Sequence, residues 1–266
     1  MQFITLNGIN LHFQVTGLGD GKPVLVFINS LGTDFRIWRE VVAELADQFA
    51  IVTYDKRGHG LSDLGEPPYR MADHASDLAA LLDHLGVEKA IICGLSIGGQ
   101  IAQQLYADRP DLISALIFCG TAARIGDSDF WHQRIGNIEA NGLEAVADGI
   151  LERWFTPQFR DPANVKFPGY RTMLVRQPVA GYVGSCAAIA AFDMREKAGQ
   201  IAVPTLCVVG DQDGATPPEM VKDFAKAIPG ARFEIVAGAG HIPCVETPEQ
   251  LSGLIGDFTA KIAWEQ

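Results

Sequence analysis

The sequence predicts an α/β fold with a doubly wound, mostly parallel sheet and a helical insert. Short apolar runs such as 24–28 are typical of strands that are covered on both faces. Segments with helical spacing, such as 74–86, alternate with these runs, which favours a parallel sheet with helices on both faces. The alternation stops after Thr121 and returns near residue 198. We therefore expect a core of residues 1–121 and 198–266 and a helical cap of residues 122–197.

Each expected element has its own local signal. A short alternating pattern indicates a strand over 11–17, and the other expected strands are apolar runs. Gly86 is a natural end for the helix expected over 74–86, because glycine is common just after the last turn of a helix. The remaining expected strands are 24–28, 51–54, 90–93, 115–120, 204–210 and 233–236. The expected helices of the core are 38–49, 74–86, 98–110, 218–228 and 248–263, and those of the cap are 129–140, 142–155 and 181–196.

Composition and charge exclude several classes of protein. The chain has 266 residues and a formal net charge of −11, which argues against a nucleic-acid binder and a polybasic membrane-surface protein. It has five cysteines without a CxxC pair, and three lie in apolar runs, as expected of a reduced cytoplasmic protein. No secretory signal is expected at the start, and no apolar run is long enough to span a membrane.

The sharpest motif is Gly94-Leu95-Ser96-Ile97-Gly98, between a predicted strand and a predicted helix. That context is the one required by a nucleophile elbow, in which a strained turn exposes a serine hydroxyl. Glycines beside the serine allow neighbouring backbones to approach closely. We therefore predict that Ser96 is a nucleophile. The competing interpretation is an ordinary serine at a strand-to-helix turn.

A serine nucleophile needs a base, and His241 is the histidine best placed to supply it. His241 lies in a glycine-rich loop directly after the strand 233–236, at the edge where a parallel sheet gathers its active groups. Asp211 and Asp213 both follow the strand 204–210 and compete to orient this histidine. We choose Asp213, which lies deeper in the turn, and interpret Asp211 as a turn residue.

A tetrahedral intermediate also needs hydrogen-bond donors for its oxyanion. We expect one donor to be the backbone N–H of Ile97, the residue after the nucleophile. The second is expected from the loop that follows the strand 24–28, where we choose the backbone N–H of Leu31. The side chain of Leu31 would then help to form a wall of the pocket.

Taken together, these residues resemble the α/β-hydrolase superfamily over nearly the whole chain, and the order Ser, Asp, His matches that family. More particular segments are similar to 3-oxoadipate enol-lactonases of bacterial aromatic catabolism. The similar segments are NSLGTDFRIW, TAARIG, LERWFTPQF and GYVGSCAAIAAFDMRE; residues 160–177 carry no recognised motif.

This resemblance implies a helical cap over the active site and hydrolysis of an enol-lactone to 3-oxoadipate in the cytoplasm. It also implies that the chemistry uses no metal and no organic cofactor. Ring opening would expel an enolate, which is a better leaving group than an alkoxide. Two alternatives stay open: a carboxylesterase or carbon–carbon bond hydrolase with the same triad, and a non-catalytic small-molecule receptor on the same scaffold.

The implied substrate carries a carboxylate, and arginine is its natural partner because the guanidinium can bind a carboxylate through two bonds. We choose Arg134, which is three residues from Trp131 and would share a helix face with it. Trp131 and Trp154 are then candidate walls of the binding site. The arginine candidates in the cap are Arg124, Arg134, Arg153, Arg171, Arg176 and Arg195.

Overall fold

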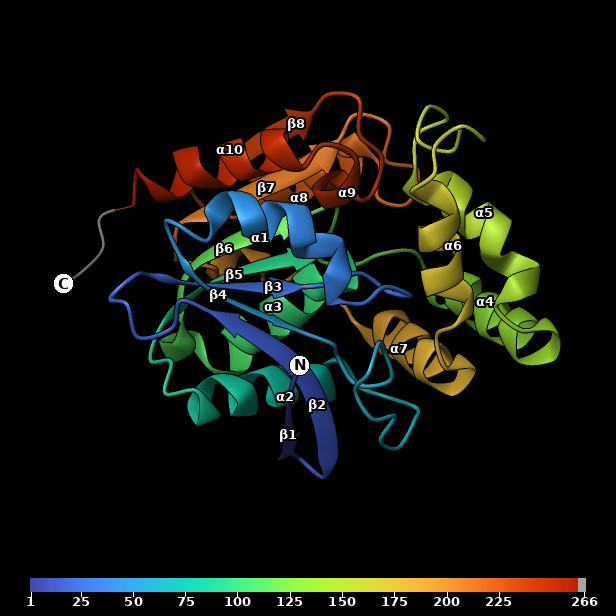
Figure 1. The fold of residues 1–266 in the computed structure, drawn as a ribbon, viewed down its shortest axis with the longest axis horizontal. Coiled ribbons are helices and arrows are strands. Elements are labelled where there is room, and N and C mark those ends of the chain that lie inside the picture. The colour runs from blue at the N-terminus through green and yellow to red at the C-terminus, as the bar shows by residue number, and fades with distance from the viewer. Residues whose placement is uncertain (263–266) are drawn as a thin grey trace.

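The computed structural model describes residues 1–262 and shows an eight-stranded sheet with helices on both faces (Figure 1). The strands are β1 (Gln2–Leu6), β2 (Ile9–Thr16), β3 (Val24–Ile28), β4 (Ala50–Tyr54), β5 (Ala90–Leu95), β6 (Ile113–Cys119), β7 (Thr205–Gly210) and β8 (Arg232–Val236). Their order in the sheet is β1-β2-β4-β3-β5-β6-β7-β8. In this described sheet β2 is antiparallel to both of its neighbours, β1 and β4, and all the other strand pairs are parallel. The predicted α/β class with a mostly parallel sheet is therefore confirmed.

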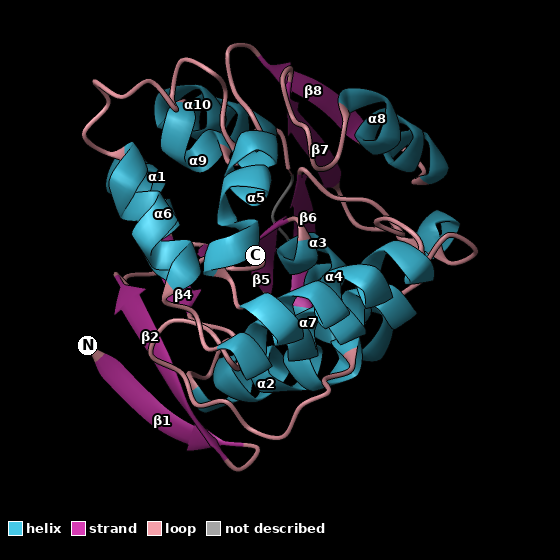
Figure 2. Ribbon diagram, turned by 90° about the vertical axis from the view of Figure 1, so that its right-hand side faces the viewer, coloured by secondary structure: helices cyan, strands magenta, loops and turns pink. Residues whose placement is uncertain are grey.

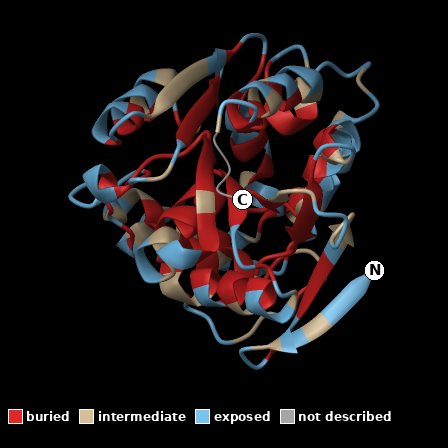
Figure 3. Cartoon of the chain, turned by 90° about the vertical axis from the view of Figure 1, so that its left-hand side faces the viewer, coloured by how far each residue is buried: buried red, intermediate tan, exposed pale blue. Residues whose placement is uncertain are grey.

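The core of the molecule lies along the central strands. Every residue of β4, β5 and β7 is buried, which explains why these strands read as continuous apolar runs (Figure 3). β3, in the middle of the sheet, pairs in parallel with β4 on one side and β5 on the other. Consequently the loops after these strands emerge at the same edge of the sheet.

The edge strand β1 is the one strand that the sequence analysis missed. It is mostly exposed (Figure 3), so it has no apolar run to mark it. It forms a hairpin with β2 through Asn7 and Gly8, which have φ angles of 52° and 77°. An Asn-Gly pair with two positive φ angles is the strongest short-range signal for a hairpin and could have revealed this strand.

The helices of the core cover the two faces of the sheet. In Figure 1, α1 (Arg39–Leu45) and α10 (Pro248–Thr259) lie above the sheet, and α2 (Met71–His84) and α3 (Ile97–Asp108) lie below it. The remaining core helices are α8 (Pro218–Ala227) and the short α9 (Pro243–Glu246). α10 ends at Thr259; the predicted end of this helix at residue 263 lies outside the described residues.

Four helices lie between β6 and β7 and gather at one end of the sheet (Figures 1 and 2). They are α4 (Ser128–Asn141), α5 (Ala147–Trp154), α6 (Phe167–Val175) and α7 (Val179–Ala191). We call residues 122–197 the helical insert. The helix expected over 142–155 is divided into a short 3-10 turn and α5, and α6 was not expected.

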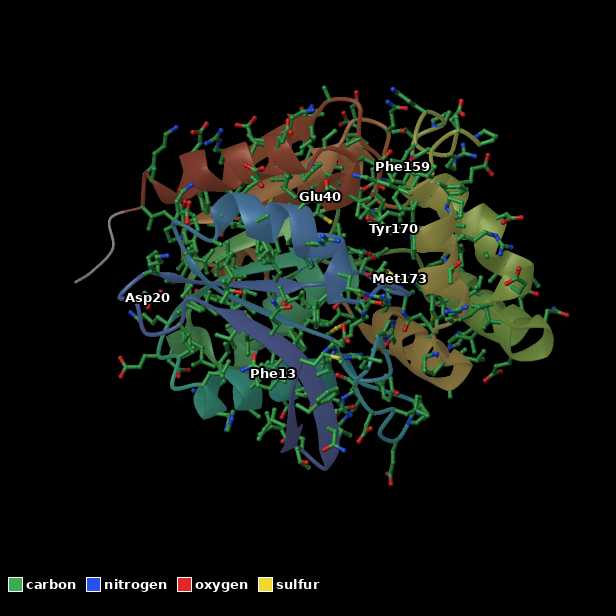
Figure 4. The ribbon with its side chains drawn as sticks, viewed as in Figure 1. Phe13, Asp20, Glu40, Phe159, Tyr170 and Met173 are labelled. Carbon is green, nitrogen blue, oxygen red and sulfur yellow. The ribbon has the colours of Figure 1, made fainter. Side chains whose placement is uncertain are left out.

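An aromatic cluster explains how α6 forms in a proline-rich segment. Phe155 and Phe159 stack with their ring centroids 4.6 Å apart, and Tyr170 of α6 lies 5.5 Å from Phe155 and 5.9 Å from Phe159. Figure 4 shows Phe159 and Tyr170 side by side at the junction of the insert and the core. Pro168 occupies the first turn of α6, where a proline is compatible with a helix.

Candidate active site

Ser96 lies on a strained turn between β5 and α3. Its φ and ψ angles are 59° and −119°, which are unusual for a residue with a side chain. The flanking glycines are required by close backbone contacts: a Cβ on Gly94 would lie 2.2 Å from the Gly98 carbonyl oxygen, and one on Gly98 would lie 2.4 Å from that of Ile28. The sequence around Ser96 thus forms the turn expected of a nucleophile elbow.

Asp213 and His241 meet at the ends of β7 and β8. The Asp213 carboxylate lies 2.8 Å from His241 Nδ1, and both side chains are buried. Three further donors fix this carboxylate: the backbone N–H groups of Ala215 and Thr216 and the Thr216 hydroxyl, each at 2.8 Å. An aspartate held in this way fixes the orientation of the imidazole and the proton on its Nδ1.

Asp211 has a different set of contacts. Its carboxylate accepts hydrogen bonds from the backbone N–H groups of Gly238 and Ala239, at 2.9 and 3.2 Å. It therefore stabilises the loop that precedes His241 and does not bond to the imidazole itself. Of the two acids that the sequence left in competition, the structure places Asp213 against His241.

Most of the predicted site residues line one cavity of about 220 Å³ beneath the helical insert, whereas Asp213 and Ile97 lie outside its lining. Its wall includes six residues that the sequence analysis chose for the site, and Arg153 from its list of arginine candidates. The six are Leu31, Ser96, Trp131, Arg134, Trp154 and His241. They come from loops of the core and from α4 and α5. The structure thus brings together residues that lie as much as 210 positions apart in the chain, from Leu31 to His241 (241 − 31 = 210).

Two backbone N–H groups remain available to a ligand: that of Leu31, which lines the cavity, and that of Ile97, which follows Ser96 in the chain. Within residues 1–262, neither the N–H of Leu31 nor that of Ile97 has a hydrogen-bond acceptor. The neighbouring N–H of Gly32 is occupied, because it donates to His59 Nε2 at 3.0 Å. Leu31 and Ile97 are therefore the two predicted donors that the surrounding loops leave free.

Arg134 reaches the cavity from α4 between two aromatic rings. Its guanidinium carbon lies 5.4 Å from the centroid of the Trp131 ring and 5.7 Å from that of Tyr182, and it donates a hydrogen bond to the Tyr182 hydroxyl. Arg153, on α5, also lines the cavity and lies over the Phe130 ring. In the part of the chain that is described, neither arginine has an acidic partner within 4 Å.

The other four arginine candidates of the insert do not line this cavity. Arg124 and Arg195 pair with Asp193, and Arg171 pairs with Glu144 and Asp148. Arg176 lines a separate surface groove. Of the six arginine candidates named from the sequence, the structure places two, Arg134 and Arg153, at the cavity.

Residues 153–156, at the end of α5, bind the backbone of both loops that carry Asp213 and His241. Gly214 N–H donates to the Arg153 carbonyl at 3.2 Å, and His241 N–H donates to the Trp154 carbonyl at 2.8 Å. We call residues 153–156 the clamp segment. Trp154 therefore has two roles: its ring forms part of the cavity wall and its carbonyl holds the His241 backbone.

Glu246, which the sequence analysis missed, ties the clamp segment to the same loop. It accepts hydrogen bonds from the Thr156 N–H at 3.0 Å, the Thr156 hydroxyl at 2.7 Å and the Gly240 N–H at 2.7 Å. Burial raises the pKa of its carboxyl group despite these donors. Thr156 and Glu246 are 90 positions apart, so no local pattern could have indicated this contact.

We expect Glu246→Gln to lower the free energy of unfolding by about 1–3 kcal/mol. All three partners of the carboxylate are donors, so the amide NH₂ of glutamine would face at least one donor and leave it without an acceptor. Urea denaturation of the variant checks this. Glu249→Gln, at an exposed glutamate of the next helix, is the control and should stay within about 0.5 kcal/mol of wild type. Equal stability of the two variants would contradict the prediction.

The described residues give two further facts about the site and the chain. Residues 1–262 contain no group of three or more His, Cys, Asp or Glu side chains that could hold a metal ion. None of the helices in that range is long and apolar enough to cross a membrane.

The fold and the site together define a class of protein. The sequence matches the family model for the alpha/beta hydrolase fold over residues 23–248, and the chain belongs to this family. It is a hydrolase.

Three relatives are more particular. The chain is 33% identical to 3-oxoadipate enol-lactonase 2 of Acinetobacter baylyi over 92% of this chain and 91% of that protein. It is 34% identical to 3-oxoadipate enol-lactonase 1 of the same organism, over 96% and 95% of the two chains. The crystal structure of the enol-lactonase from Burkholderia xenovorans superposes with a TM-score of 0.94 at 36% identity, covering 98% of this chain and all of the other. The resemblance seen in the sequence is therefore confirmed.

Proposed function

We propose that this protein hydrolyses 3-oxoadipate enol-lactone to 3-oxoadipate by a Ser96–His241–Asp213 triad. One observation carries the proposal: Ser96 on its strained turn, the Asp213-bound His241 and the unpaired Arg134 all line a single cavity. The similarity to named enol-lactonases supports the choice of substrate. On this proposal, residues 122–197 form the cap over a core of residues 1–121 and 198–266.

The proposed reaction follows from the chemistry of these groups. Ser96 attacks the lactone carbonyl while His241 takes its proton, and Asp213 stabilises the imidazolium that forms. The N–H groups of Leu31 and Ile97 bind the oxyanion of the tetrahedral intermediate. Collapse of the intermediate breaks the ring C–O bond and releases an enolate, which His241 protonates. Tautomerisation gives the ketone, and water then releases the acyl group from Ser96.

The same proposal assigns roles to the cap. Arg134 binds the carboxylate of the substrate, and the rings of Trp131 and Trp154 form the apolar walls beside it. Arg134 is already aligned by the Tyr182 hydroxyl and by two aromatic rings, so little side-chain freedom is lost when a carboxylate binds. The proposed location is the cytoplasm, which is consistent with five free, buried cysteines.

Loss of the ultraviolet absorbance of freshly generated enol-lactone tests the proposed function directly. Wild type and Ser96→Ala are compared at equal concentration, with p-nitrophenyl acetate as a second substrate. We expect fast loss of the lactone with wild type alone and much slower cleavage of the acetate ester. Cleavage of the acetate ester without turnover of the lactone would favour a general carboxylesterase. Activity on neither substrate would favour a non-catalytic small-molecule receptor on this scaffold.

We expect Arg134→Leu to raise KM for the lactone by about 10- to 100-fold, because a charge-assisted hydrogen bond to the substrate is lost. KM for the neutral p-nitrophenyl acetate should change by less than about threefold. Steady-state kinetics on both substrates checks this. Arg171→Leu is the matched control, since Arg171 pairs with acids outside the cavity. If Arg153→Leu gave the large effect instead, the carboxylate would belong to Arg153.

A further inference from the structure

Lys56, in the loop after β4, is a buried cation that the proposed reaction does not use. It is 1% exposed, and its ammonium donates to the backbone carbonyl of Ser30 at 2.7 Å. Within residues 1–262 no carboxylate lies within 4 Å of its Nζ. Burial lowers the pKa of Lys56 to about 7. A buried cation without an acidic partner is costly, so its position calls for an explanation.

The neighbouring carboxylate is already committed to other donors. Asp55 accepts hydrogen bonds from His12 Nδ1 at 2.8 Å and from the backbone N–H groups of Phe35 and Leu61, each at 2.9 Å. Lys56 is thus directed at the Ser30 carbonyl and not at the acid beside it in the sequence. The charge of Lys56 therefore acts on the loop after β3, which contains Ser30.

The Ser30 carbonyl belongs to the same peptide group as the Leu31 N–H. A trans peptide is planar, so its C=O and N–H point in opposite directions. Lys56 holds the carbonyl end of this group, and the N–H end has no acceptor among residues 1–262. Ser30 and Leu31 both line the cavity that contains Ser96.

We propose that Lys56 is a positioning residue of the oxyanion hole, which fixes and polarises the Ser30–Leu31 peptide group so that the Leu31 N–H becomes a stronger donor. This inference rests on the proposed function, because it assumes that the Leu31 N–H binds the oxyanion. A cation bound to a carbonyl oxygen draws electron density from the amide, and linked hydrogen bonds strengthen one another in this way.

Other contacts orient the same loop without adding a charge to it. The Thr33 hydroxyl donates to the Ser30 carbonyl at 2.9 Å, and His59 Nε2 accepts from the Gly32 N–H. Thr33 therefore provides a matched comparison: its hydroxyl is a neutral donor to the same oxygen atom that the Lys56 ammonium binds. If orientation alone mattered, removal of either donor would have a similar effect.

The test compares Lys56→Met with Thr33→Val. Methionine fills a similar volume without a charge, and replacing a buried charge by an apolar side chain is often neutral or stabilising. We expect Lys56→Met to reduce kcat by about 10- to 50-fold with KM within about twofold, which is less than the loss of a whole oxyanion donor. Thr33→Val should reduce kcat by less than about fivefold.

Inhibitors separate catalysis from folding. A trifluoromethyl ketone adds to Ser96 and places an oxyanion in the hole, so its affinity should fall by the same factor as kcat/KM in Lys56→Met. A cyclic ether analogue of the lactone, which keeps the side-chain carboxylate but has a CH₂ group in place of the ring carbonyl, cannot form an oxyanion and should bind as it does to wild type. Equal weakening of both inhibitors would indicate a general structural role and would overturn the proposal.

The pH dependence gives a second readout. The ionisable groups that interact electrostatically with the Lys56 ammonium are Asp34, Asp55, His59 and His74. Because the pKa of Lys56 is near 7, its charge is lost as the pH rises through neutrality, and kcat of wild type should decline there. Lys56→Met should lack this decline. The same decline in both proteins would overturn the role assigned to the charge.

Three outcomes keep this inference distinct from the proposed function. If Ser96→Ala is inactive and Lys56→Met is within twofold of wild type, the inference fails and the triad stands. If Ser96→Ala is as active as wild type, the proposed function itself fails. If Lys56→Met does not fold, Lys56→Gln, a neutral amide, replaces it, and wild-type activity in that variant would overturn the inference.

Discussion

Ser96→Ala is expected to reduce kcat for the enol-lactone by roughly 10⁵- to 10⁶-fold while leaving the fold intact. The hydroxyl is the only group lost, and alanine is smaller than serine, so packing around the turn is not disturbed. The backbone at residue 96 has a φ angle of 59°, a strain that serine and alanine share. The substitution therefore tests the chemistry and not the turn.

The measurement is single-turnover loss of lactone absorbance, with thermal unfolding as the control for folding. Ser96→Gly would relax the strained backbone as well as remove the hydroxyl, and it should be at least as stable as Ser96→Ala. Both variants should be equally inactive. Residual turnover within about tenfold of wild type in a folded Ser96→Ala protein would show that water attacks the carbonyl directly, with His241 as the general base.

Asp213→Asn is expected to reduce kcat by roughly 10⁴-fold. The amide nitrogen of asparagine can donate to His241 Nδ1, which then presents its proton on Nε2, the atom that must accept the proton from serine. Thr216 adds to the effect, because its hydroxyl donates to Oδ2, the oxygen that faces His241, and an amide nitrogen in that place would leave the hydroxyl without its acceptor.

Asp211→Asn is the matched control for this prediction. Its side chain accepts two backbone N–H groups through one oxygen, Oδ1, and the carbonyl oxygen of asparagine can accept both. We therefore expect a loss of kcat below about tenfold. Steady-state kinetics of the two variants decides the matter: equal losses, or a larger loss at Asp211, would remove Asp213 from its assigned role.

The part of the site that could be predicted is the part that local sequence determines. Ser96, Asp213 and His241 each lie in the chain shortly after a predicted strand. The parallel sheet brings the ends of those strands together. Apolar periodicity likewise gave the fold class and the position of the insert. Among the described strands only β1 was not predicted, because it is mostly exposed and has no such periodicity.

The residues that were missed act through contacts between distant parts of the chain. Lys56 and Ser30 are 26 positions apart, and Tyr182 meets Arg134 across 48 positions. Lys56 also lies in a polar, glycine-rich loop, where a lysine is ordinarily solvent-exposed. Its burial depends on how two loops pack together, which periodicity and local motifs do not describe.

The clamp segment also bears on how new specificities could arise on this scaffold. Residues 153–156 hold the loops of Asp213 and His241 mainly through backbone carbonyls. These hydrogen bonds therefore tolerate substitutions of side chains but not a change in the course of the backbone. An insert exchanged between relatives must therefore keep the course of the chain through residues 153–156. Residues of α4 and Ile189 of α7 line the cavity, so substitutions there can reshape it while the course of the chain through 153–156 is preserved. Directed evolution toward other esters should begin at those two helices.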